Sequence, residues 1–314
     1  MNGGPSAGPG APVHVPGPEG PWEEVGDRLD EHGRVVVFTT WGQWMAAALL
    51  DPGLRPLLGQ DWPRYRQTPA AAGRLRFAVS RAVMKYAAAT ALDVPPASLD
   101  LGHHPGGRPV LRGLGGEVEL SLAHTDELIV VGVSRTGPIG VDAEPADRAL
   151  SFDLLRDHVC TAREGRALAA LPEEERRAGL LRLWTLKEAY TKALGHGLRR
   201  RFPGFGFGRD AEGRTVLTEG QDDGTGAGAG AGEGAGAGPG EGAWEFATHL
   251  VQDRYVVSSA HRRRPPGTPA REPAVDTASG RGAGPLEETA AGHGGELRFL
   301  RPVTSGPGRG RRTP

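Results

Sequence analysis

The sequence is poor in cysteine, in lysine and in long apolar runs, and each shortage excludes a class of protein. Cys160 is the only cysteine among the 314 residues, so an internal disulfide and a zinc site built from several thiolates are both excluded. No apolar run reaches the roughly 18 residues of a membrane-spanning helix. The N-terminal segment lacks the charged and apolar regions of a secretory signal. We therefore expect a soluble, cytoplasmic protein without a membrane partner.

The sequence also lacks an excess of either charge, since the formal net charge is −1. This balance disfavours a globally basic nucleic-acid binder. Glycine and proline are abundant instead, with 50 and 27 residues, while hydrophobic residues make up only 38%. This composition predicts low-complexity segments around a smaller globular core. We expect disorder or loose attachment at residues 1–32 and 263–314, and a flexible Gly/Ala loop at 219–243.

Strand-like and helix-like segments alternate along the rest of the chain. Apolar residues recur at helical spacing over 70–92 and 178–194. Short runs rich in β-branched residues are typical of strands, and they span 34–40, 118–122, 128–134, 139–144, 215–217, 244–250 and 255–260. This mixture predicts an α+β (mixed α/β) fold.

Two carboxylates stand at strand spacing in the segment Gly140-Val141-Asp142-Ala143-Glu144. Residues two apart on a strand point to the same face, so Asp142 and Glu144 are expected to face outward together, with Val141 toward the core. Paired carboxylates suit Mg²⁺, which takes one or two of them together with water and phosphate oxygens. A solvated acidic face at a strand end is the alternative interpretation.

Two of the three lysines of the chain, Lys187 and Lys192, lie on one predicted helix. Glu188 and Lys192 are four residues apart and therefore neighbours on the helix surface. An exposed salt bridge is one interpretation of this pair. Because arginine fills nearly every other cationic position, the lysines instead favour a site that needs a compact ammonium, such as a phosphate site.

Three further positions are candidates on weaker grounds. His124, expected in a connection between two strands, either binds a phosphate or is an ordinary loop histidine. The turn Gly106-Gly107-Arg108-Pro109 either allows a ligand to approach the backbone or is a plain turn. Arg74 belongs to a basic cluster that is either functional or a solvated helix face.

The order of these motifs resembles that of the 4′-phosphopantetheinyl transferases of the surfactin-synthetase-activating type. Gly140 to Glu144 matches the family pattern G-[IV]-D-x-E, and Trp184 to Gly195 matches [FW]-[ST]-x-K-E-[AS]-x-x-K-x-x-G without a gap. The resemblance implies a pseudo-dimer of two similar subdomains, residues 33–138 and 139–262, with coenzyme A in the cleft. It implies transfer of phosphopantetheine from coenzyme A to a serine of an apo acyl or peptidyl carrier protein, with release of 3′,5′-ADP.

The resemblance also implies roles for single residues. It places Mg²⁺ on Asp142, Glu144 and Glu188, and it makes Glu188, Lys192 and Asp142 the catalytic residues, with Glu188 as the base. The positions that it implies for coenzyme A binding are Arg74, Gly107, Arg108, Pro109, His124, Lys187 and Lys192. Relatives are mostly monomers, and a monomer is expected here.

The sequence departs from the family at the histidine motif. The usual pattern N-x-S-H-S reads Ser121-Leu122-Ala123-His124-Thr125 here, so one serine hydroxyl that could bind phosphate is missing. A non-catalytic module that binds coenzyme A or a carrier protein is therefore the alternative hypothesis. The arginine runs 262–264 and 309–312 lack interleaved aromatic residues, so nucleic-acid binding is expected to be accessory at most.

Overall fold

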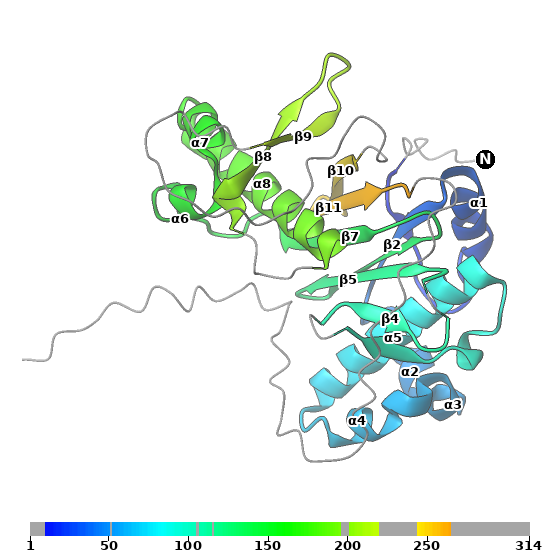
Figure 1. The fold of residues 1–314 in the computed structure, drawn as a ribbon. Coiled ribbons are helices and arrows are strands. Elements are labelled where there is room, and N and C mark those ends of the chain that lie inside the picture. The colour runs from blue at the N-terminus through cyan, green and yellow to red at the C-terminus, as the bar shows by residue number, and fades with distance from the viewer. Residues whose placement is uncertain are drawn as a thin grey trace, which may run out of the picture.

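The protein is described by a computed structural model over residues 10–50, 52–104, 107–114, 116–195, 201–219 and 244–264. Helices and strands are mixed in both halves of the chain, which confirms the predicted α+β class (Figure 1). Most of the predicted Gly/Ala loop and nearly all of the predicted C-terminal tail lie outside the described residues. Among the described residues, no helix is long and apolar enough to cross a membrane.

The N-terminal half, residues 10–138, contains a four-stranded sheet in the order β1-β2-β6-β5. Its strands are β1 (Val13–His14), β2 (Arg34–Thr40), β5 (Glu119–Thr125) and β6 (Leu128–Ser134). A separate hairpin joins β3 (Leu101–His103) and β4 (Pro109–Leu111). The helical elements are α1 (Trp22–His32), α2 (Met45–Leu50), α3 (Leu54–Leu58), η1 (Gly59–Asp61), α4 (Trp62–Gln67), α5 (Ala71–Leu92) and η2 (Pro96–Ser98).

The prediction of disorder over 1–32 is wrong for residues 10–32. Val13 in β1 pairs in parallel with β2, and helix α1 buries Val25 and Leu29 in the core of this half. The two buried residues are four apart, so they lie on one helix face. Gly33 ends the helix in the left-handed conformation. The glycine- and proline-rich composition upstream masked this short amphipathic pattern.

The C-terminal half, residues 139–264, contains a three-stranded antiparallel sheet in the order β10-β11-β7. Its strands are β7 (Ile139–Pro145), β10 (Trp244–Val251) and β11 (Tyr255–Arg262). A second hairpin joins β8 (Phe205–Arg209) and β9 (Thr215–Glu219). The helical elements are α6 (Phe152–Val159), α7 (Ala162–Ala169), α8 (Glu173–Leu194) and η4 (Phe202–Gly204).

The two halves repeat one strand order. In the first half β2 pairs with the closing strand β6, which pairs with β5, and in the second half β7 pairs with β11, which pairs with β10; the short strand β1 is an addition to the first half. Each half also has one helix of 22 residues, α5 or α8, and one hairpin between that helix and its last two strands. Lys85 and Lys187 each lie fourteen residues after the first residue of their helix, and both are fully buried.

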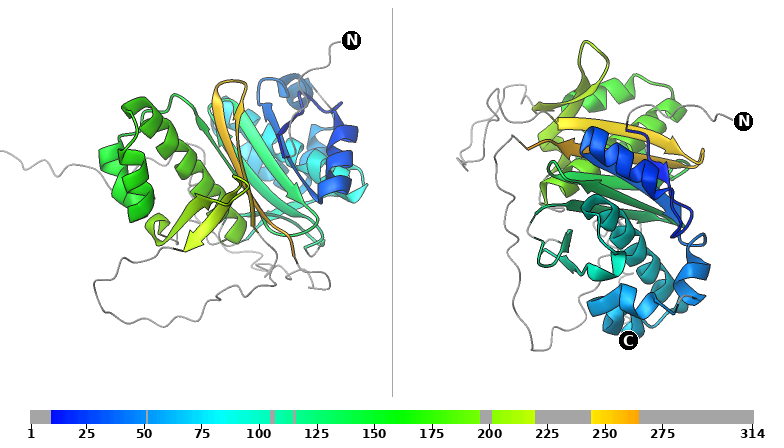
Figure 2. Two further views of the ribbon diagram at one scale, coloured as in Figure 1. Left: turned by 90° about the horizontal axis from the view of Figure 1, so that it is seen from above. Right: turned by 90° about the vertical axis from the view of Figure 1, so that its right-hand side faces the viewer.

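The two sheets pack against each other through a shared apolar core. Figure 2 shows α6–α8 (green) and the helices of the N-terminal half (blue to cyan) on opposite sides of the strands. The side chains between the sheets are Val36, Phe38, Ala123, Leu128, Val130, Val141, Ala143, Val251, Tyr255 and Val257. The Val141 amide also donates to Ser121 Oγ at 3.0 Å, which links β7 directly to β5.

Candidate functional site

Helix α8 lies directly on strand β7 at Gly140, the first residue of the G-V-D-A-E motif. A Cβ built at Gly140 would stand 1.9 Å from the Ala189 carbonyl oxygen and 2.5 Å from the Ala193 nitrogen. Both obstacles are helix backbone, which cannot move aside as a flexible side chain can. Glycine is therefore required for this approach. Glu188 and Lys192 are the residues directly before Ala189 and Ala193 on α8. The close approach of the helix at Gly140 therefore brings both of them to strand β7, which carries Asp142.

Asp142 and Lys192 form an ion pair across this contact, with Lys192 Nζ 2.8 Å from Asp142 Oδ1. The other carboxylate oxygen, Oδ2, is buried without a hydrogen-bond partner. Burial raises the pKa of Asp142, and the positive charge of Lys192 opposes that rise. The alternative interpretation of a solvated acidic face is wrong, because Asp142 and Glu144 are both buried, at 7% and 8% exposed. The strand alternation itself is right, since Val141 lies in the core between the sheets.

Glu144 has a counter-ion that lies outside the G-V-D-A-E motif. Arg148 Nη1 forms an ion pair with Glu144 Oε1, and its guanidinium carbon lies 5.7 Å from the ring centroid of Trp184 on α8. Burial raises the pKa of Glu144, the negative charge of Asp142 raises it further, and Arg148 opposes both. The second carboxylate of the motif is thus neutralised by a cation four residues along the chain.

Glu188 has the most informative pKa of the site, raised from 4.5 to about 7. Burial is the largest cause, followed by the negative charges of Asp142 and then Glu144, while Lys192 and Arg148 act in the opposite direction. The four other charged groups therefore surround the carboxyl of Glu188 closely enough to influence it. A carboxyl with a pKa near neutrality is suited to accept a proton during a reaction at pH 7.

The chemistry of this carboxylate set fits a hard divalent cation such as Mg²⁺. Three carboxylates share one region, and the buried Asp142 Oδ2 is an oxygen ligand without a partner. Lys192 and Arg148 already pair with two of these carboxylates. Over the described part of the chain, no three His, Cys, Asp or Glu side chains are arranged so that they could hold a metal ion. A bound cation would thus require these side chains to reorient.

Lys187 lies away from this cluster although it neighbours Glu188 in sequence. Its Nζ donates to Glu164 Oε2 at 2.7 Å and to three backbone carbonyls, and the side chain has no exposed surface. The carbonyls belong to Val159, Phe202 and Phe205. With four oxygen acceptors around it, this ammonium has no donor left for a phosphate. The geometry does not fit the expected contact of Lys187 with coenzyme A, and we do not retain it.

Glu164 explains why Lys187 is buried there. Its Oε2 also accepts from the Thr161 amide at 2.8 Å, while its Oε1 accepts from the Phe207 amide at 2.8 Å. Thr161 is the N-cap of α7 and completes a capping box with Glu164. The Glu164–Lys187 pair therefore joins α6, α7, α8 and β8.

Arg74, from the N-terminal half, lies at a concave surface. Its Nη1 donates to the Thr68 and Pro69 carbonyls at 3.0 and 3.1 Å. An open cavity of ≈ 350 Å³ is lined by Trp41, Tyr65, Ala71, Ala72, Arg74 and Leu75. The Trp41 amide donates to the Glu127 carbonyl at 3.0 Å, so this cavity adjoins the turn between β5 and β6.

His124 belongs to strand β5 itself, and the prediction that it lies in a connection is wrong. It is half-buried and pairs with Ile129 of β6. The β5–β6 turn that follows it is tied to the β10–β11 turn, because Arg254 contacts Asp126 and Glu127 at 3.7 and 2.7 Å. The end of β7 that carries Glu144 is at this same edge, since the amide of the following Ala146 donates to the Arg254 carbonyl at 2.8 Å.

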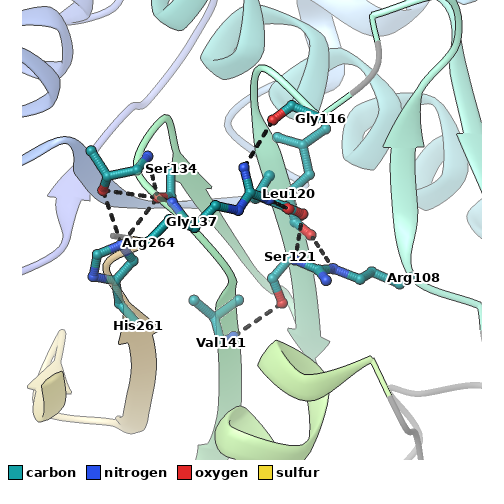
Figure 3. A network of polar contacts seen from close by, with 11 residues as sticks. Arg108, Gly116, Leu120, Ser121, Ser134, Gly137, Val141, His261 and Arg264 are labelled. Carbon is teal, nitrogen blue, oxygen red and sulfur yellow. Dashed lines mark hydrogen bonds and ion pairs between the residues drawn. The ribbon is translucent and has the colours of Figure 1, made fainter. Parts of the chain in front are cut away.

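Arg108 reaches from the first half toward the end of α8. Its Nη2 donates to Glu119 Oε2 at 2.7 Å, and its Nη1 would lie 3.9 Å from a Cβ on Gly195, which caps α8. Arg264 forms an ion pair with the other oxygen of Glu119, and Figure 3 shows both arginines in this network. Burial lowers the pKa of Arg108, and Glu119 opposes this. The neighbouring Gly107 has a positive φ of 83° with open space around it, and Pro109 begins β4.

The sequence predictions thus have an uneven outcome. Asp142, Glu144, Glu188 and Lys192 share one region, whereas Arg74, His124 and the Gly107–Pro109 segment stand on the first half and Lys187 is internal. The missed contributors are Arg148 and Glu164. A detectable signal existed for both, since Arg148 lies four residues after Glu144, and Glu164 follows Thr161 at capping-box spacing.

Comparisons with known proteins bear on the same region. Residues 138–229 match the family model of the 4′-phosphopantetheinyl transferase superfamily. The 4′-phosphopantetheinyl transferase HetI of Nostoc is 30% identical over 129 residues, which cover 40% of this chain and 54% of HetI. The L-aminoadipate-semialdehyde dehydrogenase-phosphopantetheinyl transferase of Eremothecium gossypii is 31% identical, over 48% of this chain and 55% of its own length. The chain therefore spans about half the length of these curated relatives.

Among solved structures, the holo-[acyl-carrier-protein] synthase of Thermotoga maritima is similar at a TM-score of 0.30, with 21% identity over 41% of this chain and 65% of that chain. The family-model match contains both motifs of the carboxylate cluster, Gly140 to Glu144 and Trp184 to Gly195. Together with the two relatives, it shows that this region of the chain is similar to the 4′-phosphopantetheinyl transferase superfamily.

Proposed function

We propose that this protein is a Mg²⁺-dependent 4′-phosphopantetheinyl transferase of the surfactin-synthetase-activating type. It moves phosphopantetheine from coenzyme A to a serine of an apo acyl or peptidyl carrier protein and releases 3′,5′-ADP. This is a holo-[acyl-carrier-protein] synthase activity. The observation that carries the proposal is the contact of α8 with β7 at Gly140, which gathers Asp142, Glu188 and Lys192 in one place.

Asp142, Glu144 and Glu188 would hold the divalent cation. When bound, the cation supplies positive charge that neutralises the pyrophosphate of coenzyme A, the largest requirement of phosphoryl transfer. The Lys192 side chain is 22% exposed. Once Asp142 binds the cation, the Lys192 ammonium would be able to donate a hydrogen bond to a phosphate oxygen. Without these cations, the carboxylates would repel the pyrophosphate.

Glu188 is the proposed base. Its carboxylate accepts the proton of the carrier serine, directly or through one water, as the serine oxygen forms its bond to the β-phosphorus. The bond between that phosphorus and the bridging oxygen breaks, and 3′,5′-ADP leaves with the electron pair. The pKa of about 7 supports this role, because much of Glu188 is ionised at neutral pH yet remains basic enough to take a proton.

Coenzyme A would lie along the edge where the two halves meet. The ties from Arg254 to the β5–β6 turn and from Ala146 to Arg254 place the end of β7 beside the end of β5, where His124 stands. His124 would contact a phosphate, Arg74 and its cavity would take the adenosine end, and Gly107, Arg108 and Pro109 would line the adenine side. The lost serine at Ala123 removes one hydroxyl donor from this arrangement.

The repeated strand order supports two similar transferase subdomains, residues 33–138 and 139–262, that form a pseudo-dimer within one chain. Because the chain itself would supply both halves of the cleft, we propose that it works as a monomer. Its proposed location is the cytoplasm, where coenzyme A and carrier proteins are available.

The test is intact-mass spectrometry of apo carrier proteins incubated with the protein, coenzyme A and Mg²⁺. A gain of one phosphopantetheine mass supports the proposal, and an unchanged mass across acyl and peptidyl carriers contradicts it. Glu188→Gln is expected to abolish the gain. Glu174→Gln, on the exposed first turn of the same helix, is the matched control and is expected to keep it.

The same assay distinguishes transfer from the alternative hypothesis, a non-catalytic module that binds coenzyme A or a carrier protein. One observation favours this alternative: both Asp142 and Glu144 are already paired with cations, and no described set of three ligands is arranged for a metal. Saturable coenzyme A binding with no mass gain on any carrier, at several Mg²⁺ concentrations, would favour it over transfer.

A further inference from the structure

Arg148 is held between two elements at the margin of the carboxylate cluster. It follows the end of β7, where its amide donates to the Pro145 carbonyl at 3.0 Å. One side of its guanidinium pairs with Glu144, and another faces the ring of Trp184, one turn before Glu188 on α8. The side chain is 20% exposed, so it lies between the buried carboxylates and solvent.

The two carboxylates of strand β7 are neutralised in different ways. Asp142 pairs with Lys192 through one oxygen and keeps the other oxygen buried without a partner. Glu144 is paired with Arg148. A cation that enters the cluster can therefore bind directly to the unpaired oxygen of Asp142. It can bind Glu144 only after the ion pair between Glu144 and Arg148 has broken.

The stacking on Trp184 makes this exchange feasible. The contact of a guanidinium with an aromatic ring does not depend on the carboxylate, so Arg148 retains one favourable contact after Glu144 turns away. Two positive charges on one carboxylate repel each other, and in a partly buried site this repulsion is only weakly screened. Arg148 and a divalent cation therefore compete for Glu144.

We propose that Arg148 is an internal counter-ion that occupies Glu144 in the ligand-free protein and thereby lowers the affinity of the site for divalent cations. Arg148 is thus a positioning residue that acts through Glu144. This inference rests on the proposed cation site at Asp142, Glu144 and Glu188. It predicts that the cation binds weakly until a polyanionic substrate adds its own phosphate oxygens.

The test measures Mn²⁺ binding to the purified full chain without coenzyme A, by the loss of the free Mn²⁺ signal in electron paramagnetic resonance. Arg148→Gln is expected to bind Mn²⁺ roughly three- to tenfold more tightly than the wild type, because one nearby positive charge is removed. Arg148→Lys keeps the charge and is expected to stay close to wild type. Arg156→Gln, an exposed arginine on α6 paired with Asp157, is the matched control and is expected to change nothing.

A double-mutant cycle distinguishes competition from a structural effect. In the Glu144→Gln background, Arg148→Gln is expected to raise Mn²⁺ affinity clearly less than it does in the wild type, because the contested carboxylate is gone. Unchanged or weaker Mn²⁺ binding by Arg148→Gln, with binding abolished in Asp142→Asn, would overturn the role of Arg148 but keep the cation site. If the wild type and Asp142→Asn bind Mn²⁺ equally, or neither binds it, the cation site itself is wrong and the role of Arg148 is overturned with it.

Discussion

Lys192 on α8 and Asp142 on β7 are fifty residues apart in sequence, yet their Nζ and Oδ1 atoms lie 2.8 Å apart. Lys192 is largely buried at 22% exposed, and Asp142 still more so. A pair in such a position contributes little net stability, because the desolvation of both charges offsets much of their attraction. In the proposed mechanism, the pair holds the lysine in place for a phosphate.

Asp142→Asn tests this pair. The substitution removes the charge that attracts a divalent cation and orients Lys192, so we expect carrier modification to slow roughly 100-fold or more. Because the charge of Asp142 raises the pKa of Glu188, that pKa should fall in the variant. Carrier mass gain and ¹³C NMR titration of Glu188 measure the two effects. Asp153→Asn on α6 is the exposed control. An unaltered rate of carrier modification in Asp142→Asn would contradict a role for Asp142 in the site.

Gly140→Ala tests the packing that creates the site. The added Cβ meets two backbone atoms of α8 well inside van der Waals contact, so the helix must shift away from β7. We expect a loss of at least about 2 kcal/mol in the free energy of unfolding, together with loss of transfer. Chemical denaturation measures the first effect. Gly42→Ala, where a Cβ meets nothing within 4 Å, is the control and should be nearly neutral. Wild-type stability in Gly140→Ala would contradict the contact.

Glu188→Gln tests the raised pKa through stability. Because the folded-state pKa of about 7 exceeds the ordinary 4.5, the folded protein holds a proton that the unfolded chain loses between these values. The contribution of Glu188 to stability is therefore present below about pH 4.5 and lost as pH rises through about 7. The glutamine of the variant is neutral at every pH. The Tm of the variant should therefore rise relative to that of the wild type as the pH increases from about 4.5 to about 7.

The comparison is made by thermal unfolding between pH 4 and 8, with Glu174→Gln as the control that should parallel the wild type. A constant Tm difference across the range would show that Glu188 is not perturbed. A gain in stability joined to a loss of transfer would identify Glu188 as a residue that costs stability in order to serve the reaction.

The sequence specified more of the fold than of the site's electrostatics. Strand 34–40 is observed with those bounds and helix 70–92 begins one residue later, because apolar periodicity records burial directly. Strand alternation placed Asp142 and Glu144 correctly on the face opposite the core, but it did not indicate that α8 rather than water covers that face. What decides this is the missing side chain of Gly140, and strand alternation contains no information on which helix will pack there.

Lys187 shows a second limit. Its motif position and its rarity both pointed to a ligand contact, yet its partners are Glu164 and three carbonyls from segments up to 28 residues away. A lysine that binds phosphate and one that joins loops have the same local sequence. Lys85 in the first half is equally buried and donates to the Leu57 carbonyl, so this use of lysine occurs twice in the fold.

Lys187→Met therefore tests a structural role and not a substrate contact. Removing the ammonium leaves the buried Glu164 carboxylate without its counter-ion, and we expect a loss of about 3–5 kcal/mol in the free energy of unfolding. Glu164→Gln alone should also destabilise. The double variant, which removes both charges, should lose clearly less than the sum of the two single variants.

The measurement is chemical denaturation of the four proteins in this cycle, with the KM for coenzyme A as a second readout wherever the variant folds. A structural role predicts that the KM stays within about twofold of the wild type, since the ammonium has no surface through which to meet a phosphate. A stable Lys187→Met variant with a strongly raised KM would return Lys187 to the binding site. Losses that simply add would show that Glu164 and Lys187 contribute independently, contrary to their 2.7 Å ion pair.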